Sequence, residues 1–218
     1  MERYARRLPG VEINSCFYRP HRAATYARWA ATVPPGFRFS AKIPREITHV
    51  RKLVAATDAL DRFLSEIQAL GDRLGPLLVQ LPPSLGFEEA IAGGFFDAFR
   101  VRFDGAIVCE PRIPAWFTDD ADRLLARFQV ALVAADPAPV PRAAVPGGWA
   151  GLVYRRLHGS PRMYYSGYSA DYLDETARLV AQGRQEQWCI FDNTALGEAT
   201  HDALDLLKRV QSAGASPG

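Results

Sequence analysis

Seven short apolar segments, separated by stretches of helical periodicity, set the pattern of this chain. They span residues 11–18, 37–44, 77–82, 106–112, 131–136, 153–159 and 188–193. Several are nearly continuous runs of Val, Ile, Leu, Phe and Ala, which is typical of strands covered on both faces of a parallel sheet. Each segment therefore predicts a strand.

The stretches between these segments show the 3.6-residue spacing of amphipathic helices. Between residues 60 and 74 the apolar positions fall on one helix face. Thr57 is suited to cap this helix, and Gly75 followed by Pro76 is suited to end it. We expect one helix here, packed on the strands around it.

Later helices carry similar signals. Thr118 and Ser169 can cap two of them, Gly183 can end the second, and residues 199–210 predict a last helix. Strand and helix alternate from the first segment onward, which predicts a single α/β domain over residues 1–218. A TIM barrel of parallel strands is the architecture that we expect.

Polar side chains gather toward the ends of the segments. In four segments a polar face alternates with an apolar one, and the polar positions include Glu12, Asn14, Tyr18, Lys42, Glu110, Arg112, Arg156 and His158. The last segment ends in Asp192 and Asn193. Active sites of parallel α/β barrels are built at the carboxyl ends of the strands, so we expect these groups to meet at one opening. A closed salt-bridge network that fixes strand register is the structural alternative.

The predicted catalytic residues are Glu12, Lys42, Glu110 and His158. Either glutamate would act as general acid or base, and His158 would relay a proton near neutral pH. Lys42 would hold anionic oxygens together with Arg112 and Arg156.

No motif indicates a dedicated cofactor. The dinucleotide-binding glycine pattern, the P-loop, the G-x-S-x-G elbow and H-E-x-x-H do not occur. A divalent metal held by oxygen and imidazole ligands is an open alternative, with Glu12, Glu110, Asp136, His158 and Asp192 as its candidates. Lys42 and the arginines would repel such a cation. We therefore predict neither metal nor cofactor.

The composition and charge of the chain exclude few functional classes. The formal net charge of +2 argues neither for nor against nucleic acid, because binding depends on local patches. No apolar run approaches the roughly 18 residues of a membrane span, and the first residues lack the apolar core of a signal peptide. These features predict a cytoplasmic protein without a membrane partner. Cys16, Cys109 and Cys189 show no disulfide or zinc spacing, which favours buried, unreactive thiols.

Two connecting segments are long. Residues 137–149 contain four prolines and predict a lid or a packed surface loop. Residues 160–168 place Tyr164, Tyr165 and Tyr168 directly after a strand. These rings can stack on a sugar or a base, or pack on the rim of the barrel.

Several motifs in order resemble the YecE-like family, domain of unknown function 72. They are VEINSCFYRP, W-x(7)-F-x-F-S-x-K with I-T-H following, LGPLLVQLPPS, VCEPR with a nearby Trp, YRRLHG and FDN. The resemblance implies a TIM barrel whose activity is not established. It places the family's polar positions on Glu12, Asn14, Tyr18, Lys42, Thr48, His49, Gln80, Glu110, Arg112, Trp116, Arg156, His158, Gly159 and Asn193.

The resemblance also extends the predicted ligand site. The predicted substrate-binding residues are Asn14, Tyr18, His49, Gln80, Arg112, Trp116, Arg156, Asp192 and Asn193. The chain departs from the family at Cys16, where a small hydroxyl residue is usual, and at Asp192, where asparagine is usual. It also lacks the family's opening strand. We therefore expect a TIM barrel incomplete at its N-terminus, with about seven strands and an open edge through which a second subunit can pack.

Three functions remain open at this point. The leading hypothesis is an enzyme, a hydrolase, lyase or isomerase, that acts on a small polar or anionic ligand bearing a sugar or phosphate. The second is a barrel that processes nucleic acid or a nucleotide, and the third is a non-catalytic binding or scaffold protein.

Overall fold

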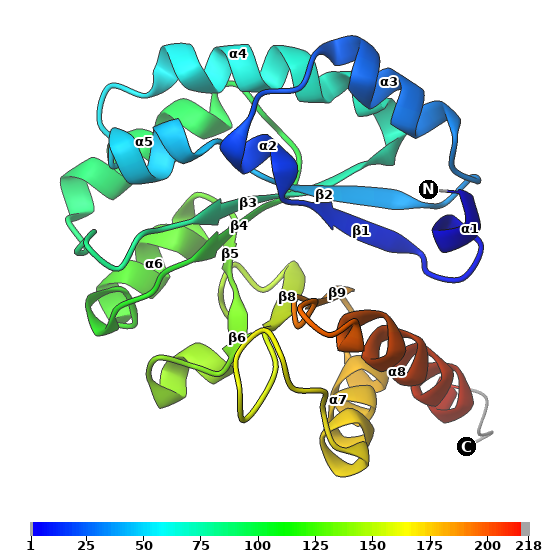
Figure 1. The fold of residues 1–218 in the computed structure, drawn as a ribbon. Coiled ribbons are helices and arrows are strands. Elements are labelled where there is room, and N and C mark those ends of the chain that lie inside the picture. The colour runs from blue at the N-terminus through cyan, green and yellow to red at the C-terminus, as the bar shows by residue number, and fades with distance from the viewer. Residues whose placement is uncertain (1, 215–218) are drawn as a thin grey trace.

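The computed structural model describes residues 2–214, which form a mixed α/β fold with mostly parallel strands (Figure 1). The strands are β1 (Gly10–Ile13), β2 (Arg38–Lys42), β3 (Leu74–Gln80), β4 (Ile107–Glu110), β5 (Val130–Leu132), β6 (Ala134–Asp136), β7 (Gly147–Gly148), β8 (Leu152–Leu157) and β9 (Glu186–Phe191). The helices are α1 (Glu2–Ala5), α2 (Ser15–Tyr18), α3 (Ala23–Ala31), α4 (Thr57–Ile67), α5 (Glu89–Arg100), α6 (Asp119–Arg127), α7 (Ala170–Gln182) and α8 (Glu198–Gly214). Short helical turns cover Glu46–Val50, Gln68–Arg73, Pro114–Trp116 and Pro141–Ala144.

The strands form two sheets that one segment connects. The first sheet has the order β1-β2-β3-β4-β5-β7 and the second has the order β6-β8-β9. Only Val133 separates β5 from β6, and its N–H donates to the carbonyl of Cys109 at 2.9 Å. The chain therefore passes from one sheet to the other almost without interruption.

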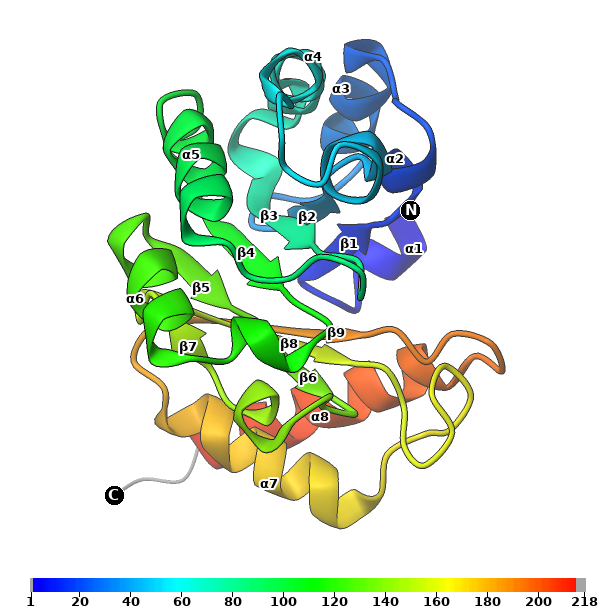
Figure 2. The ribbon, with the colours of Figure 1, turned by 90° about the vertical axis from the view of Figure 1, so that its left-hand side faces the viewer.

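The two sheets do not close into a barrel. Within residues 2–214, β1 pairs only with β2, and β9 pairs only with β8. The predicted α/β class with mostly parallel strands is thus confirmed, whereas the predicted TIM barrel, incomplete at its N-terminus, is not. Helices α3, α4 and α5 lie outside the first sheet, and α7 and α8 lie beside each other next to β9 (Figures 1 and 2).

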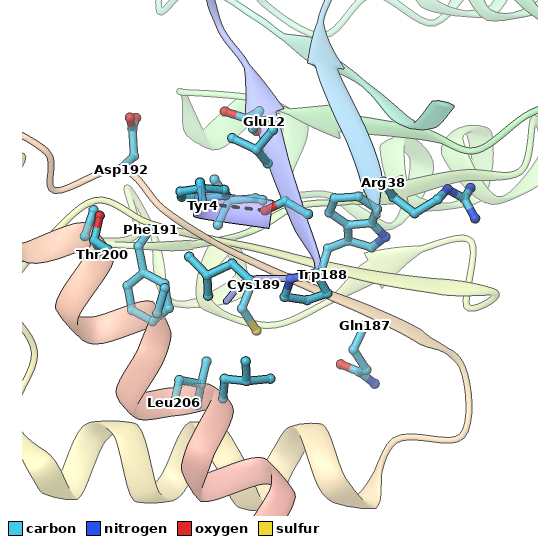
Figure 3. A pocket seen from close by; sticks show the side chains of 18 of the residues that line it. Tyr4, Glu12, Arg38, Gln187, Trp188, Cys189, Phe191, Asp192, Thr200 and Leu206 are labelled. Atoms are coloured by element: carbon cyan, nitrogen blue, oxygen red, sulfur yellow. Dashed lines mark hydrogen bonds between the residues drawn. The ribbon is translucent and has the colours of Figure 1, made fainter. Parts of the chain in front are cut away.

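A groove of about 500 Å³ separates β1 from β9 (Figure 3). Along it Phe191 lies on the side of α8, and Trp188 lies on the side of Arg38. The Trp188 indole also covers two glycines: a Cβ at Gly75 would be 2.8 Å from the ring, and one at Gly10 would be 3.2 Å from it. Side chains larger than hydrogen would displace this ring.

Apolar residues fill both sides of the strands. The largest cluster, which includes Phe39, Ile67 and Phe96, lies between the first sheet and its helices. A second cluster, with Leu78 and Tyr154 among its members, occupies the inner side of the curved sheets. Burial on both faces explains why these strands appear as nearly continuous apolar runs in the sequence.

The first predicted strand is wrong beyond Ile13. Asn14 adopts right-handed helical angles (φ −93°, ψ −18°), and the next four residues form α2. The Cys16 thiol lies 3.2 Å from the Ile13 carbonyl and 3.1 Å from that of Lys42. A single helical turn that buries Cys16 and Phe17 produces the same short polarity pattern as a strand, so the sequence alone does not distinguish them.

The predicted end of the helix at residue 74 is also wrong. Helix α4 ends at Ile67, a 3-10 turn follows, and Gly71 has a positive φ of 52°. Gly75 and Pro76 lie inside β3. Apolar residues of the turn continue the helical spacing beyond the helix, which hides the boundary. The caps at Thr118 and Ser169 are confirmed, since each side chain accepts a backbone N–H three residues on.

The loop of residues 137–149 is a packed surface segment. Its 3-10 turn buries Ala143, and β7 pairs antiparallel with β5. Among the residues that the structure describes, no helix is both long and apolar enough to cross a membrane.

Candidate functional site

Arg156 lies at the centre of a buried ionic cluster at the strand ends. From β8 it donates to Glu12 through Nε at 3.1 Å and through Nη2 at 2.8 Å. Its Nη1 donates to Glu110 at 2.8 Å, and Nη2 also reaches Asp192 at 3.2 Å. Glu12 lies in β1 and Glu110 ends β4, both in the first sheet, whereas Asp192 follows β9 of the second sheet, so one guanidinium joins carboxylates from both sheets. All of these hydrogen bonds are made to carboxylates of the chain itself.

His158 follows two positions later on the same side of the chain. Its Nε2 is 3.0 Å from Glu110, and its Nδ1 is 3.2 Å from Asp192. Two carboxylates facing the two ring nitrogens favour the imidazolium, which donates at both. Burial lowers the pKa of His158, but the hydrogen bonds to Asp192 and Glu110 outweigh burial and raise it above its ordinary value.

Glu110 is the buried anion of the cluster. Burial alone would raise its pKa, but the charge of Arg156, the hydrogen bond with His158 and the charge of Arg112 lower it to about 2. Arg112 lies 3.1 Å from the same carboxylate, and its side chain is 19% exposed. Glu110 therefore stays ionised at neutral pH, and Arg112 keeps a face toward solvent.

Tyr154 and Ser40 complete the inner side of this network. The Tyr154 hydroxyl donates to Glu12 at 2.8 Å and lies 2.7 Å from the Ser40 hydroxyl. Neither was predicted as a site residue. The alternation of Tyr154, Arg156 and His158 along β8 was the available signal, because all three share one face. We refer to Glu12, Glu110, Arg112, Arg156, His158 and Asp192 as the strand-end cluster.

Lys42 lies beside this cluster without a carboxylate partner. Among residues 2–214 no carboxylate oxygen lies within 4.0 Å of its Nζ. Instead Nζ sits 3.8 Å from the centre of the Phe17 ring. Burial and the charge of Arg156 lower the pKa of Lys42 to about 8, against the opposing charges of Glu110 and Glu12.

His49 packs on the same aromatic ring. Its imidazole is 5.0 Å from the Phe17 ring in an edge-on arrangement, and its Nδ1 lies 2.8 Å from the Thr48 hydroxyl. Burial, followed by the charges of Lys42, Arg45 and Arg112, lowers the pKa of His49. The charges that act on His49 are thus all positive, whereas Lys42 lies near two arginines and two glutamates.

Other predicted residues lie apart from the strand-end cluster. Tyr18 is 75% exposed on α2, and Trp116 is buried with its indole donating to the Leu85 carbonyl at 3.0 Å. Asn193 donates to Asp202 at 2.7 Å and to the Ser166 carbonyl at 2.9 Å. Trp116 and Asn193 thus hold loops in place.

Asn14 and Gln80 occupy intermediate positions. Asn14 precedes α2 and lines the groove, and its buried side-chain oxygen has no hydrogen-bond partner among the described residues. Gln80 ends β3 directly beside Glu110 in register, and it is half-buried. Because Glu110 belongs to the strand-end cluster, this pairing places Gln80 close to it.

The tyrosine loop reaches the same opening. The Tyr164 ring lies 5.7 Å from that of His158, and Arg162 stacks 3.8 Å from the centre of the Tyr165 ring. Tyr164 and Tyr165 are 41% and 38% exposed. Tyr168 instead packs inward, since its hydroxyl donates to Asp136 at 2.8 Å.

The predicted metal ligands are already engaged by other groups. Glu12, Glu110 and Asp192 accept hydrogen bonds from Arg156, and His158 faces two of these carboxylates. A guanidinium at the centre of these oxygens opposes a cation there.

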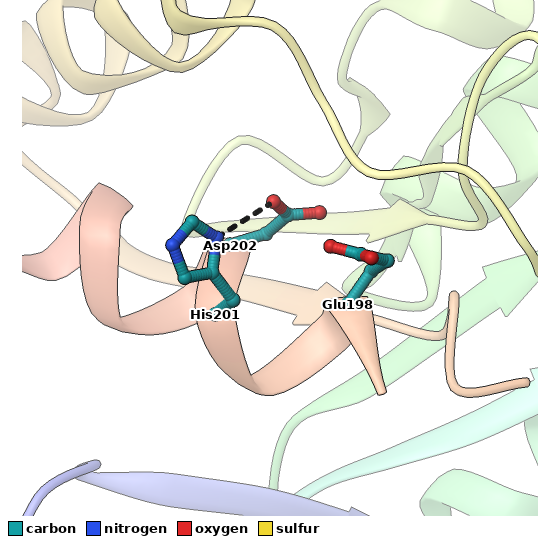
Figure 4. Close-up of side chains that lie close together, drawn as sticks. All are labelled: Glu198, His201 and Asp202. Carbon is teal, nitrogen blue, oxygen red and sulfur yellow. Dashed lines mark ion pairs between the residues drawn. The ribbon is translucent and has the colours of Figure 1, made fainter. Parts of the chain in front are cut away.

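A different set, Glu198, His201 and Asp202, brings three potential ligand atoms within 4.8 Å of one another (Figure 4). Asp202 is committed to Asn193 and to the backbone N–H of Tyr168, and the His201 side chain is 80% exposed. These contacts fix the corner between β9 and α8, and we assign no metal to them.

Known proteins were compared with the chain. A family model described as "Protein of unknown function DUF72" matches residues 1–217. The UPF0759 protein YecE of Escherichia coli (strain K12) is 31% identical over 118 residues, which is 54% of this chain and 43% of that protein. The chain therefore matches less than half the length of this curated relative.

Two solved structures share the fold. A DUF72 family protein from Enterococcus faecalis V583 superimposes with a TM-score of 0.81 at 25% identity, covering 96% of this chain and 92% of that one. A DUF72 family protein from Thermotoga maritima MSB8 gives a TM-score of 0.77 at 21% identity, covering 93% and 85%. Together with the family match over residues 1–217, these findings show that the chain belongs to the DUF72 family of proteins of unknown function.

Proposed function

We propose that this chain is an enzyme that binds a small anionic ligand, bearing a phosphate or carboxylate, at the ends of its strands and acts on it by acid–base chemistry. The observation that carries the proposal is the ammonium group of Lys42, which is buried near Arg112 and makes no direct ion pair with a carboxylate of residues 2–214. Burying an unpaired charge is costly, and folding alone does not require it. An anion bound there would supply the missing counter-charge.

The three cationic side chains divide into two roles. Arg156 uses four of its five N–H donors on three carboxylates, so it has little capacity left to bind a ligand. Arg112 makes one close contact and remains 19% exposed, so its other donors can bind an oxyanion. Lys42 and Arg112 are therefore the ligand-binding cations of the proposal, and Arg156 holds the anions in place.

The proton chemistry centres on Lys42. A general acid or base works best when its pKa lies near the working pH, and the pKa of Lys42 is about 8. Glu110, with a pKa of about 2, stays a carboxylate and stabilises positive charge. Asp192, whose side chain is 25% exposed, is the carboxylate through which His158 can exchange a proton with solvent or ligand.

The strand arrangement supports this location. If β5 and β6 count as one interrupted strand, seven parallel strands follow one another in chain order, as in a TIM barrel that lacks one strand. The cluster lies at the carboxyl ends of β1, β4, β8 and β9, the end at which such barrels bind substrates.

Ligand binding and turnover test the proposal together. Thermal shifts at constant ionic strength would compare inorganic phosphate, glucose 6-phosphate and ribose 5-phosphate with the neutral sugars, and ³¹P NMR would follow conversion. We expect anions alone to stabilise the protein, the Arg112→Gln variant to lose this effect, and Arg142→Gln, at an exposed ion pair, to keep it. Equal responses of the two variants, or no response to any anion, would overturn the proposal.

A nucleotide is the second candidate ligand, favoured by the exposed Tyr164 beside His158 and by the Arg162–Tyr165 stack. An aromatic ring next to an anion site can stack on a base. Adenosine monophosphate would then bind more tightly than ribose 5-phosphate, and Tyr164→Ala would remove the difference. Equal affinities would exclude this candidate.

A further inference from the structure

Lysine is rare in this chain, and one lysine is buried. Lysine and arginine together number 26, but only Lys42, Lys52 and Lys208 are lysines. Lys52 and Lys208 are exposed, whereas Lys42 is 8% exposed at the end of β2. The chain thus places one of its few lysines beside the strand-end cluster, where an arginine would supply the same charge.

The two basic side chains differ in what they can do chemically. A guanidinium binds oxyanions in a bidentate manner but does not lose its proton in proteins. An ammonium can lose a proton and become a nucleophilic amine when it is desolvated or lies near other cations. A lysine among arginines is therefore the residue suited to covalent chemistry.

The surroundings of Lys42 meet these conditions. Its Nζ faces the Phe17 ring at 3.8 Å, and no carboxylate of residues 2–214 lies within 4.0 Å to hold it as an ammonium. Burial and the charge of Arg156 lower its pKa to about 8. At pH 7 about one molecule in ten then carries the free amine.

We propose that Lys42 Nζ attacks the carbonyl carbon of a small anionic aldehyde or ketone and forms a Schiff base, with Arg112 holding the anionic group. The step forms a C–N bond at Nζ. The carbonyl oxygen and the two hydrogens of the neutral amine leave as one water molecule, and no oxidant or reductant takes part. This inference rests on the proposed function, because the same anion site positions the substrate, and it narrows the substrate class to oxo compounds.

Reductive trapping tests the covalent step. The protein is incubated with glyoxylate, pyruvate or dihydroxyacetone phosphate and sodium cyanoborohydride, which delivers hydride to the C=N bond and leaves a stable secondary amine. Peptide mass spectrometry then compares the three lysines in one molecule. We expect at least one compound to modify Lys42 at least tenfold more than Lys52 or Lys208, and inorganic phosphate to slow modification of Lys42 alone. Equal modification of all three lysines, or none at Lys42, would overturn the inference.

The Lys42→Arg variant separates this inference from the proposed function. It keeps the positive charge but has no amine to react, so it should still be stabilised by inorganic phosphate and should give no adduct at residue 42. If the natural chain binds phosphate but forms no adduct, the Schiff base is excluded and the anion site stands. If it neither binds phosphate nor forms an adduct, both are excluded. Circular dichroism checks that the variant is folded. The comparison of the three lysines in the natural chain tests the adduct independently of this variant.

Discussion

Replacing Arg156 by methionine would expose what holds the strand-end cluster together. Methionine keeps an unbranched apolar stem but has no charge, so Glu12, Glu110 and Asp192 would lose the guanidinium that they share. The Arg156 and Glu12 side chains are only 2% and 1% exposed, so water does not replace the lost contacts. The variant therefore retains buried carboxylates without their main counter-charge.

The expected loss of stability follows from two estimates. Removing one partner of a buried ion pair costs about 3–5 kcal/mol. Separately, the pKa of Glu110 falls from its ordinary 4.5 to about 2, which at about 1.4 kcal/mol per pH unit corresponds to about 3 kcal/mol. Because each kcal/mol lowers Tm by about 2–4 °C in a chain of this size, we expect Arg156→Met to lower Tm by about 6–20 °C.

The stability loss in Arg156→Met should depend on pH. In the natural chain the pKa of Glu110 is lowered, so its stabilising contribution is present above pH 4.5 and is lost as the pH falls toward 2. In the variant, burial would raise the pKa of Glu110, so its protonation at acidic pH relieves the cost. The stability difference between the two proteins should therefore be smaller at pH 5 than at pH 8.

Urea and thermal denaturation followed by circular dichroism at both pH values would measure this difference. Arg123→Met is the matched control, because Arg123 pairs with Asp120 on the surface, where both side chains are about 70% exposed. Such pairs contribute about 0–1 kcal/mol. A loss in Arg156→Met no greater than that of the control, or one that is the same at pH 5 and pH 8, would refute the role of Arg156.

Three further predictions concern single positions. NMR titration should place the midpoint of His158 above pH 6.5 and that of His49 below it. Because the pKa of His158 is raised in the folded protein, its contribution to stability is complete below pH 6.5 and is lost as the pH rises through the pKa of the folded state. The reverse order would contradict the assigned contacts. Gly75→Ala should destabilise the fold by about 1–3 kcal/mol in urea and alter the fluorescence of Trp188, because the new Cβ would meet the indole at 2.8 Å; an unchanged spectrum and stability would show that the ring is not held there. Thr118→Ala should cost about 1 kcal/mol in urea through loss of the α6 cap, and a Thr118→Ser variant should retain most of it; equal losses would exclude the cap.

Periodicity predicted the fold more successfully than the element boundaries. Strands buried on both faces, such as β3 and β4, leave apolar runs that the sequence shows directly. The start of α2 after Ile13 depends on thiol and backbone contacts with β2, and nothing local marks it. Boundaries that are set by distant contacts are therefore the ones that local patterns miss.

The candidate site shows the same division. Alternation along β8 predicted that Arg156 and His158 face inward, and the structure places both in the cluster. It did not predict that Arg156 would donate to three carboxylates and that Lys42 would have no carboxylate partner within 4.0 Å. Pairing between strands far apart in the chain decides which charge is satisfied, and single-sequence periodicity carries no information about such pairing.

The bond between Glu12 and Arg156 joins residues 144 positions apart in the chain. During synthesis on the ribosome, the first strand emerges long before its cationic partner exists. The carboxylate of Glu12 must stay hydrated until β8 has been translated, because burying it without Arg156 is unfavourable. The first part of the polypeptide is therefore not stabilised in its final arrangement before then. Assembly of the strand ends is consequently a late, cooperative event, and neither half of the chain is expected to acquire the native arrangement as an isolated fragment.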